Sequence, residues 1–148
     1  MTKMVIENCE QAKNDATIAA FVKLFETDAV DGVLDFRTLQ EPRYMPFWKS
    51  FYITQLVEGG HIRFVYFGTS LVDGYGKELT GQIATVEEFG AAYETLRKIN
   101  LRVIEDKTIQ YTSGSLDWLD KDFRNWHRVN VPLLKNHETH CLSVIIFE

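Results

Sequence analysis

The chain has 148 residues, which suits one ordinary domain and leaves no room for two independent hydrophobic cores. Apolar residues make up 45% and charged residues 25%, a balance that excludes a globally disordered chain. The formal net charge of −5 disfavours nonspecific binding to nucleic acid, because phosphate contacts require clustered cations.

No segment is typical of secretion or of membrane insertion. Residues 1–13 lack the apolar stretch of a signal peptide, and no apolar run reaches the roughly 18 residues that a membrane span requires. We therefore expect a cytoplasmic protein without membrane contact. Cys9 and Cys141 lie far apart and lack metal-ligand spacing, so both are expected to be free, reduced thiols.

The first third of the chain is predicted to be mainly helical. Residues 8–27 form the longest segment, and Asn8 and Gln11 make a weak capping box at its start. Four apolar side chains recur within it at helical spacing: Ile18, Phe21, Val22 and Phe25. A second, short helix is predicted over residues 34–40.

From residue 51 the apolar residues alternate, which predicts strands. A strand that begins there and a return strand over 61–68 flank Glu-Gly-Gly at 58–60, a sequence typical of a hairpin turn. Residues 69–85 contain three glycines and predict a connection of short helical turns. Residues 86–100 return to helical spacing and predict the longest helix after the N-terminal one.

The remaining residues predict three strands joined by turns, over about 108–119, 126–134 and 141–147. Together with the first hairpin they give five strands. The predicted fold class is therefore α+β, with one five-stranded antiparallel sheet and helices packed on one face.

One segment resembles a known family. Residues 63–81 read RFVYFGTSLVDGYGKELTG, and this stretch resembles a short bacterial subfamily of stand-alone PAS domains. The order of the predicted elements (strand, strand, short helices, helix, three strands) is similar to that of a PAS domain. The resemblance covers about residues 35–148 and implies a PAS-like domain preceded by an N-terminal helical extension over 1–34. The subfamily often has arginine where this chain has Val65, so an anion site is not expected on that strand.

PAS domains are mostly sensors that bind a small ligand between the sheet and the long helix, or modules that dimerise. The resemblance thus implies a sensory domain without catalytic activity, with a small-molecule ligand, a signalling partner protein or a second copy as its partners. The expected ligand-lining residues are mostly aromatic: Phe67, Tyr75, Phe89, Tyr93, Leu96, Tyr111, Trp118 and Trp126. We expect these residues to form a filled aromatic core in preference to an open cavity. In the cavity alternative, Tyr93, Tyr111 or Ser113 would supply the polar groups.

No cofactor or metal is expected. Haem-binding PAS domains typically use a histidine on the long helix, and residues 86–100 contain none. Neither cysteine lies where a flavin adduct forms. His137 and His140 are three residues apart across a predicted turn, whereas the zincin pattern needs four on one helix.

The apolar stripe of the N-terminal helix needs a cover, because a lone helix of this length is marginal in water. It can fold back on its own sheet or pack against the same helix of a second chain. We predict the symmetric homodimer, with Ile18, Phe21, Val22 and Phe25 as its interface.

The competing function is a small cone-shaped α+β enzyme, similar to ketosteroid isomerase, that acts on an apolar small molecule. Such an enzyme needs an Asp or His at the pocket floor. The pocket candidates of this chain are aromatic and neutral, which argues against it.

Overall fold

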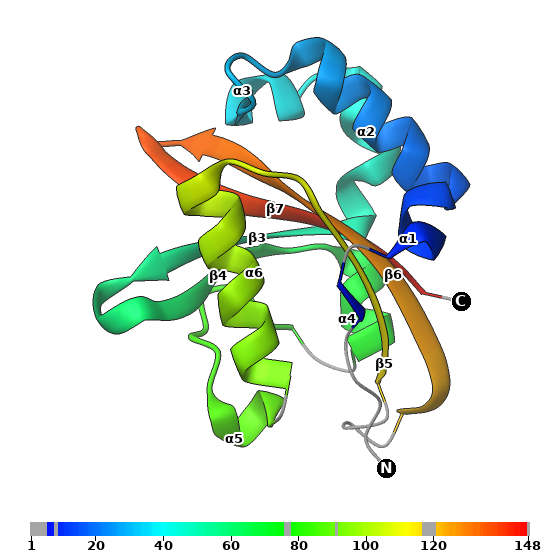
Figure 1. The fold of residues 1–148 in the computed structure, drawn as a ribbon, viewed down its shortest axis with the longest axis vertical. Coiled ribbons are helices and arrows are strands. Elements are labelled where there is room, and N and C mark those ends of the chain that lie inside the picture. Colours follow the sequence, from blue (N-terminus) through cyan, green and yellow to red (C-terminus); the bar gives the residue numbers. More distant parts are fainter. Residues whose placement is uncertain (1–5, 8, 76–77, 91, 117–120, 148) are drawn as a thin grey trace.

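The computed structural model describes residues 6–7, 9–75, 78–90, 92–116 and 121–147. Five long strands dominate the fold: β3 (Phe51–Val57), β4 (His61–Phe67), β5 (Gln110–Leu116), β6 (Lys121–Lys135) and β7 (Glu138–Phe147). They lie side by side in the order β5-β6-β7-β3-β4, and each neighbouring pair is antiparallel (Figure 1). The α+β class is confirmed.

Two short strands join the sheet, and the second of them makes it mixed and not purely antiparallel as predicted. β1 (Ile6–Glu7) pairs antiparallel with β5, and β2 (Leu34–Asp35) pairs parallel with β6. The cause of the second pairing is the length of β6. Its pairing with β5 stops at Asn130, and β2 pairs with the next part of the same edge, at Leu133 and Leu134. Backbone groups that would otherwise be left without partners are thereby satisfied.

The hairpin of β3 and β4 is confirmed. Gly59 and Gly60 of the connecting turn, η2 (Glu58–Gly60), have φ of 84° and 76°, a region that favours glycine. The outer edge of β4 is covered by the connection that follows. Phe64 N donates to Gln82 O (2.8 Å), and Ala84 N donates to Ile62 O (2.8 Å).

The predicted helix over 86–100 is two helices, and the second runs further than predicted. After α4 (Thr69–Tyr75), the chain forms α5 (Val86–Phe89) and α6 (Ala92–Asp106). Thr85 caps α5 by accepting a hydrogen bond from the backbone N–H of Glu88 (3.2 Å). Gly90, with φ of 53°, ends α5, a conformation that glycine adopts readily.

The predicted helix over 8–27 is likewise divided, into α1 (Glu10–Asn14) and α2 (Ala16–Asp28). Asp15 is extended, with ψ of 131°, and its carboxylate accepts hydrogen bonds from the backbone N–H groups of Thr17 (2.9 Å) and Ile18 (3.0 Å). Asp15 is therefore the N-cap of α2, and its cap geometry breaks the helix. Asn8, the predicted cap, lies outside the described residues.

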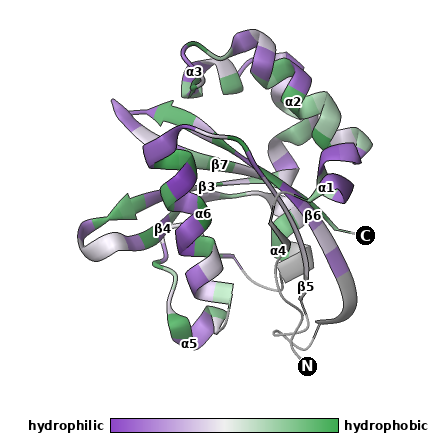
Figure 2. Ribbon diagram, viewed as in Figure 1, coloured by the Kyte–Doolittle hydropathy of each residue, from purple (hydrophilic) through white to green (hydrophobic). Residues whose placement is uncertain are grey.

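Helices cover both faces of the sheet, which corrects the prediction of helices on one face (Figure 1). α1, α2, α3 (Phe36–Leu39) and η1 (Pro42–Ser50) lie on one side, and α5 and α6 lie on the other. The strands alternate accordingly. On β7, Leu142 and Val144 pack on the α2 side, whereas Cys141 and Ile145 pack on the α6 side. Figure 2 shows hydrophobic and hydrophilic residues along both α2 and α6, the composition of helices with one buried face.

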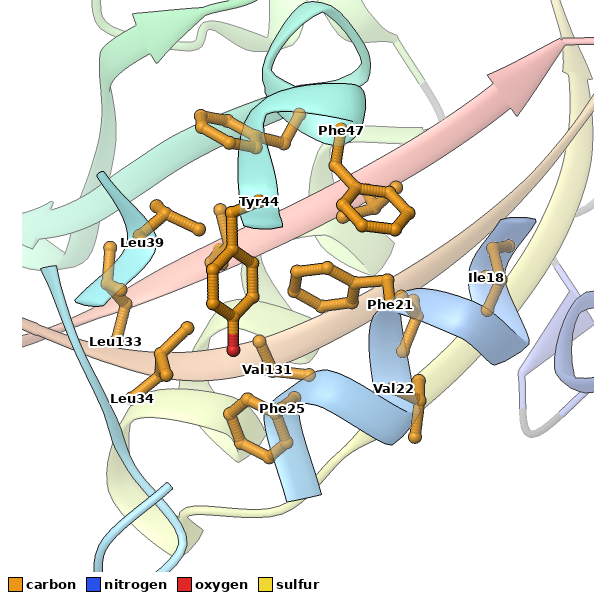
Figure 3. Close-up of a cluster of buried hydrophobic side chains, with 14 of the residues drawn as sticks. Ile18, Phe21, Val22, Phe25, Leu34, Leu39, Tyr44, Phe47, Val131 and Leu133 are labelled. Atoms are coloured by element: carbon orange, nitrogen blue, oxygen red, sulfur yellow. The ribbon is translucent and has the colours of Figure 1, made fainter. Parts of the chain in front are cut away.

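The predicted dimer interface on α2 is wrong, because the chain's own sheet covers the stripe. Ile18, Phe21, Val22 and Phe25 are all buried within the single chain, and they pack with strand residues such as Val131 (Figure 3). The α2 face of the sheet is itself strongly apolar, so folding back buries two apolar surfaces at once.

A polar anchor fixes the end of α2. The hydroxyl of Tyr44, a fully buried residue of η1, donates to the carboxylate of Asp28 (2.6 Å), and Arg43 forms an ion pair with the other oxygen (2.9 Å). Burial, together with the Asp28 carboxylate, raises the pKa of Tyr44 far above its ordinary value. This contact attaches the N-terminal helices to the segment that leads into β3.

Candidate functional site

The layer between the sheet and helices α4 to α6 contains a cluster of buried side chains, here called the aromatic cluster. Its members are Tyr52, Ile62, Phe64, Phe67, Leu71, Leu79, Ala84, Phe89, Tyr93, Leu96, Trp126 and Ile145. The rings of Phe64 and Phe89 are stacked, with centroids 5.9 Å apart. The rings of Phe64 and Phe67 meet edge to face at 5.8 Å.

Five of the eight predicted ligand-lining residues lie together in this cluster: Phe67, Phe89, Tyr93, Leu96 and Trp126. The structure therefore brings most of the predicted set to one place, between the sheet and the long helix. The side chain of Tyr75 and the whole of Trp118 lie outside what the structure describes.

Tyr111 does not belong to this layer, which corrects its assignment as a ligand-lining residue. It pairs with Val129 across the β5–β6 ladder and packs on the α2 side of the sheet. Cross-strand partners point to the same face, and Val129 is a core residue of that side. Ser113, two residues further along β5, points to the same face and is equally removed from the layer.

Beside the aromatic cluster, the same layer holds buried polar side chains, here called the polar row. Its members are Thr54, Asn100, Thr112, Arg128, Asn130 and Ser143. Ser143 donates to the amide oxygen of Asn130 (2.6 Å), and the amide nitrogen of Asn130 donates to the carbonyl of Gln110 (3.1 Å). On α6, Asn100 accepts from the Thr54 hydroxyl (2.5 Å). The row ties the strands to one another and to the helix.

Arg128 is the charged member of the polar row, and only 7% of its surface is exposed. Its Nε donates to the Thr112 hydroxyl (2.9 Å), and its Nη1 donates to the Tyr52 hydroxyl (2.7 Å). The guanidinium carbon lies 4.6 Å from the centroid of the Trp126 ring. Three residues from three strands thus hold a cation inside the layer.

Sequence reasoning missed Arg128 because its position looks exposed. Along β6, Val129, Val131 and Leu133 alternate with Arg128 and Asn130, a pattern typical of a strand with one buried and one solvated face. The feature of the sequence that could have indicated the burial of Arg128 is the length of the strand. A long strand in the centre of a sheet, with a helix predicted to cross it, is buried on both faces.

A second cluster of polar side chains lies on the α2 side of the sheet, and its members, a serine, a histidine and a cysteine, are residue types that also occur in nucleophilic catalysis. Ser113 Oγ and His127 Nδ1 are 2.6 Å apart. Burial raises the pKa of the Cys9 thiol, but hydrogen bonds from Ser113 and from the backbone of α1 outweigh it and leave the pKa below its ordinary value. Ser113 and His127 face each other directly in the β5–β6 ladder, and Ser113 is buried. The contact between Ser113 and His127 is therefore a structural contact between paired strands.

An open groove of about 480 Å³ lies on the α2 side, where α3 and η1 meet β3 and β4. Its walls are largely aromatic and aliphatic: Phe36, Leu39, Trp48, Phe51, Ile53, Val65 and Tyr66, with Gln40 and Lys135 as the polar members. Lys135 Nζ lies 5.1 Å from the centroid of the Phe36 ring. This groove is separated from the aromatic cluster by the sheet.

No metal-binding cluster occurs in the part of the chain that the structure describes: these residues contain no group of three or more His, Cys, Asp or Glu side chains that could hold a metal ion. None of the helices described is long and apolar enough to cross a membrane.

The burial of His140, on β7, predicts that the stability of the protein depends on pH. Burial lowers the pKa of His140 below its ordinary value of 6.5, and its Nδ1 hydrogen bond to the Glu138 carbonyl (3.0 Å) offsets this only in part. The unfolded chain therefore binds a proton here at a higher pH than the folded chain. We expect the free energy of unfolding to fall as the pH drops from 7 to about 5.5, before the carboxylates titrate.

Urea denaturation across this pH range tests the expectation. His140→Gln should flatten the pH dependence, whereas His137→Gln, in the exposed turn before β7, should leave it as in the original chain. An unchanged pH dependence in the first variant would contradict the assignment to His140.

Comparison with protein-family models finds no match to this chain. Comparisons with curated proteins and with solved structures also find none.

Proposed function

We propose that the chain is a non-catalytic, PAS-like sensory domain that binds a small ligand in the layer between α6 and the sheet. The observation that carries this proposal is the polar row beside the aromatic cluster. Buried polar groups cost free energy unless they are hydrogen-bonded, and packing α6 on the sheet does not require them, because apolar residues of similar size there are often equally or more stabilising. Apolar walls with a few convergent polar groups are typical of ligand sites.

The order of the elements supports the PAS-like part of the proposal. β3, β4, α4, α5, α6, β5, β6 and β7 follow one another in the order that the resemblance implies. Within the resembling segment, Leu79 is buried in the aromatic cluster and Gly81 has a φ of 85°. A Cβ on Gly68 would lie 2.5 Å from the carbonyl oxygen of Lys49, so this position requires glycine.

The residue types of the aromatic cluster and the polar row favour a non-catalytic domain over a ketosteroid-isomerase-like enzyme. The aromatic cluster and the polar row, as far as the structure describes them, contain no carboxylate and no imidazole. Proton abstraction from an apolar substrate needs such a base within hydrogen-bond reach.

Native mass spectrometry of the purified chain tests the proposal. We expect a noncovalently bound small molecule that is released on denaturation. Leu96→Trp places a larger side chain in the layer and should abolish the adduct, because Leu96 belongs to the aromatic cluster. Lys98→Trp, on the exposed side of α6, should retain it.

Circular dichroism shows whether both variants are folded. A folded chain without any adduct, which also gains no thermal stability from a metabolite extract, would contradict ligand binding. It would favour a filled core that serves protein interaction.

A further inference from the structure

We propose that the ligand carries a single negative charge, as a carboxylate attached to an apolar body, and that Arg128 binds this carboxylate. The inference rests on the proposed function, because it places the ligand in the same layer. It adds the chemical class of the ligand and the residue that selects it.

The first argument is the charge of Arg128 itself. A guanidinium cannot be deprotonated in a protein, so burial cannot neutralise it as it can neutralise a lysine or a histidine. Buried charges in folded proteins are therefore paired with an opposite charge or a metal. Arg128 is buried, yet both of its side-chain hydrogen bonds among the described residues go to neutral hydroxyls.

The second argument is where the carboxylates of the chain lie. The structure shows Arg37, Arg43 and Arg97 in ion pairs with carboxylates away from the layer. No described Asp or Glu side chain forms an ion pair with Arg128. The compensating anion is therefore expected to come from outside the described part of the chain, and a bound ligand is the source we propose.

The third argument is geometry. The guanidinium is a planar fork with five N–H donors, which suits a carboxylate that accepts two parallel hydrogen bonds. Tyr52 and Thr112 accept hydrogen bonds from Arg128, so the proton of each hydroxyl is directed elsewhere and can be donated to the same anion. The Trp126 ring lies 4.6 Å from the guanidinium carbon and is in contact with the guanidinium. The anion thus meets a site whose donors are already oriented.

The fourth argument concerns the rest of the ligand. Trp126 and Tyr52 belong both to the surroundings of Arg128 and to the aromatic cluster, so an anion at Arg128 would adjoin apolar rings. The polar row contains one cation. One cation balances a monocarboxylate, whereas a phosphate monoester carries about −1.5 to −2 charges and would need a second cation. We therefore infer an aromatic or aliphatic monocarboxylic acid.

Calorimetry on ligand-free, refolded chain tests this inference with paired probes. The acids are benzoate, phenylacetate, indole-3-acetate and hexanoate, each compared with its neutral amide, and inorganic phosphate serves as an anion without an apolar body. We expect at least one acid to bind about tenfold or more tightly than its amide, a difference that corresponds to about 1.4 kcal/mol. Phosphate should bind more weakly than that acid.

The matched variants are Arg128→Gln and Arg97→Gln. The first should weaken binding of the acid about tenfold or more, to the level of the amide. The second should bind the acid as the original chain does, since Arg97 bonds the Gly60 carbonyl and Glu94 away from the polar row. The comparison of acid with amide uses the original chain, so it stays decisive if Arg128→Gln does not fold.

Equal affinity for acid and amide, with Arg128→Gln unaffected, would overturn the carboxylate assignment while leaving the layer as a ligand site. Tighter binding of phosphate would overturn the monocarboxylate. No binding of any acid at millimolar concentration, in a chain that shows an adduct by native mass spectrometry, would overturn this inference alone. If the chain neither bound any acid nor showed an adduct by native mass spectrometry, the carboxylate assignment and the proposed function would both be overturned.

Discussion

Phe21→Ala is expected to lower the free energy of unfolding by about 3–5 kcal/mol, the usual cost of removing a fully buried phenylalanine. Phe21 is fully buried, and its ring meets those of Phe47 and Tyr44 edge to face, with centroids 5.5 Å and 6.1 Å away (Figure 3). Equilibrium denaturation in urea measures the change.

Lys23→Ala, on the exposed side of the same helix, is the control, and it should change stability by no more than about 0.5 kcal/mol. Any dependence of the thermal midpoint on protein concentration should be the same for Phe21→Ala as for the original chain, because α2 is covered by its own sheet. A loss of less than about 1 kcal/mol for Phe21→Ala would contradict the intramolecular packing of α2. The same packing would be contradicted if the thermal midpoint of the original chain rose with protein concentration and that of Phe21→Ala did not.

Phe89→Ala is expected to cost a similar amount, about 3–5 kcal/mol, on the other side of the sheet. Phe89 is the buried residue of α5, and its ring is stacked on that of Phe64, with an interplanar angle of 17°. Truncation leaves a cavity in the aromatic cluster that the surrounding strands cannot fill without moving.

The control for this variant is Glu87→Ala, two residues earlier on the exposed side of α5, with an expected change within about 0.5 kcal/mol. Equal effects of the two substitutions would show that the register of α5 against the sheet is incorrect. Restored stability of Phe89→Ala on addition of a small aromatic molecule would show that the layer can take up a ligand.

Local patterns were sufficient for the existence of the five long strands and for the β3–β4 hairpin. They missed the short strands β1 and β2, and they placed a turn at residues 120–122, where Lys121 already begins β6. The alternation of Leu142, Val144 and Ile146 with Ser143 and Ile145 on β7 predicts which residues share a face, and the structure confirms it. The paired glycines at 59 and 60 predict the hairpin, because only a residue that tolerates positive φ closes such a tight turn. These features depend on neighbours in sequence, so the sequence contains the information.

Helix boundaries were predicted less well, because single residues decide them. Asp15 and Gly90 each interrupt a segment whose apolar spacing continues across the break. Periodicity reports which side of a segment is apolar, and it does not report where a side chain or a positive φ ends the hydrogen-bond ladder.

The candidate site depended on tertiary structure in a further way. The resemblance to PAS domains implied that Phe67, Phe89, Tyr93, Leu96 and Trp126 lie in one layer, and the structure places these five together. It also implied the same place for Tyr111, which lies on the other face of the sheet. Composition and spacing could not find Arg128, which alternates with valines as solvent-facing residues do. Only the placement of β6 in the middle of a sheet with helices on both sides buries this guanidinium.

The sequence by itself determined an α+β domain, its five long strands and two apolar helical segments. The tertiary structure decided which surface covers each segment, and it placed α2 on the sheet face opposite α6. An apolar stripe is attracted equally by any apolar surface, since the hydrophobic effect has no direction. The choice between its own sheet and a second chain therefore follows from the chain's geometry, which brings α2 against Val129, Val131 and Leu133.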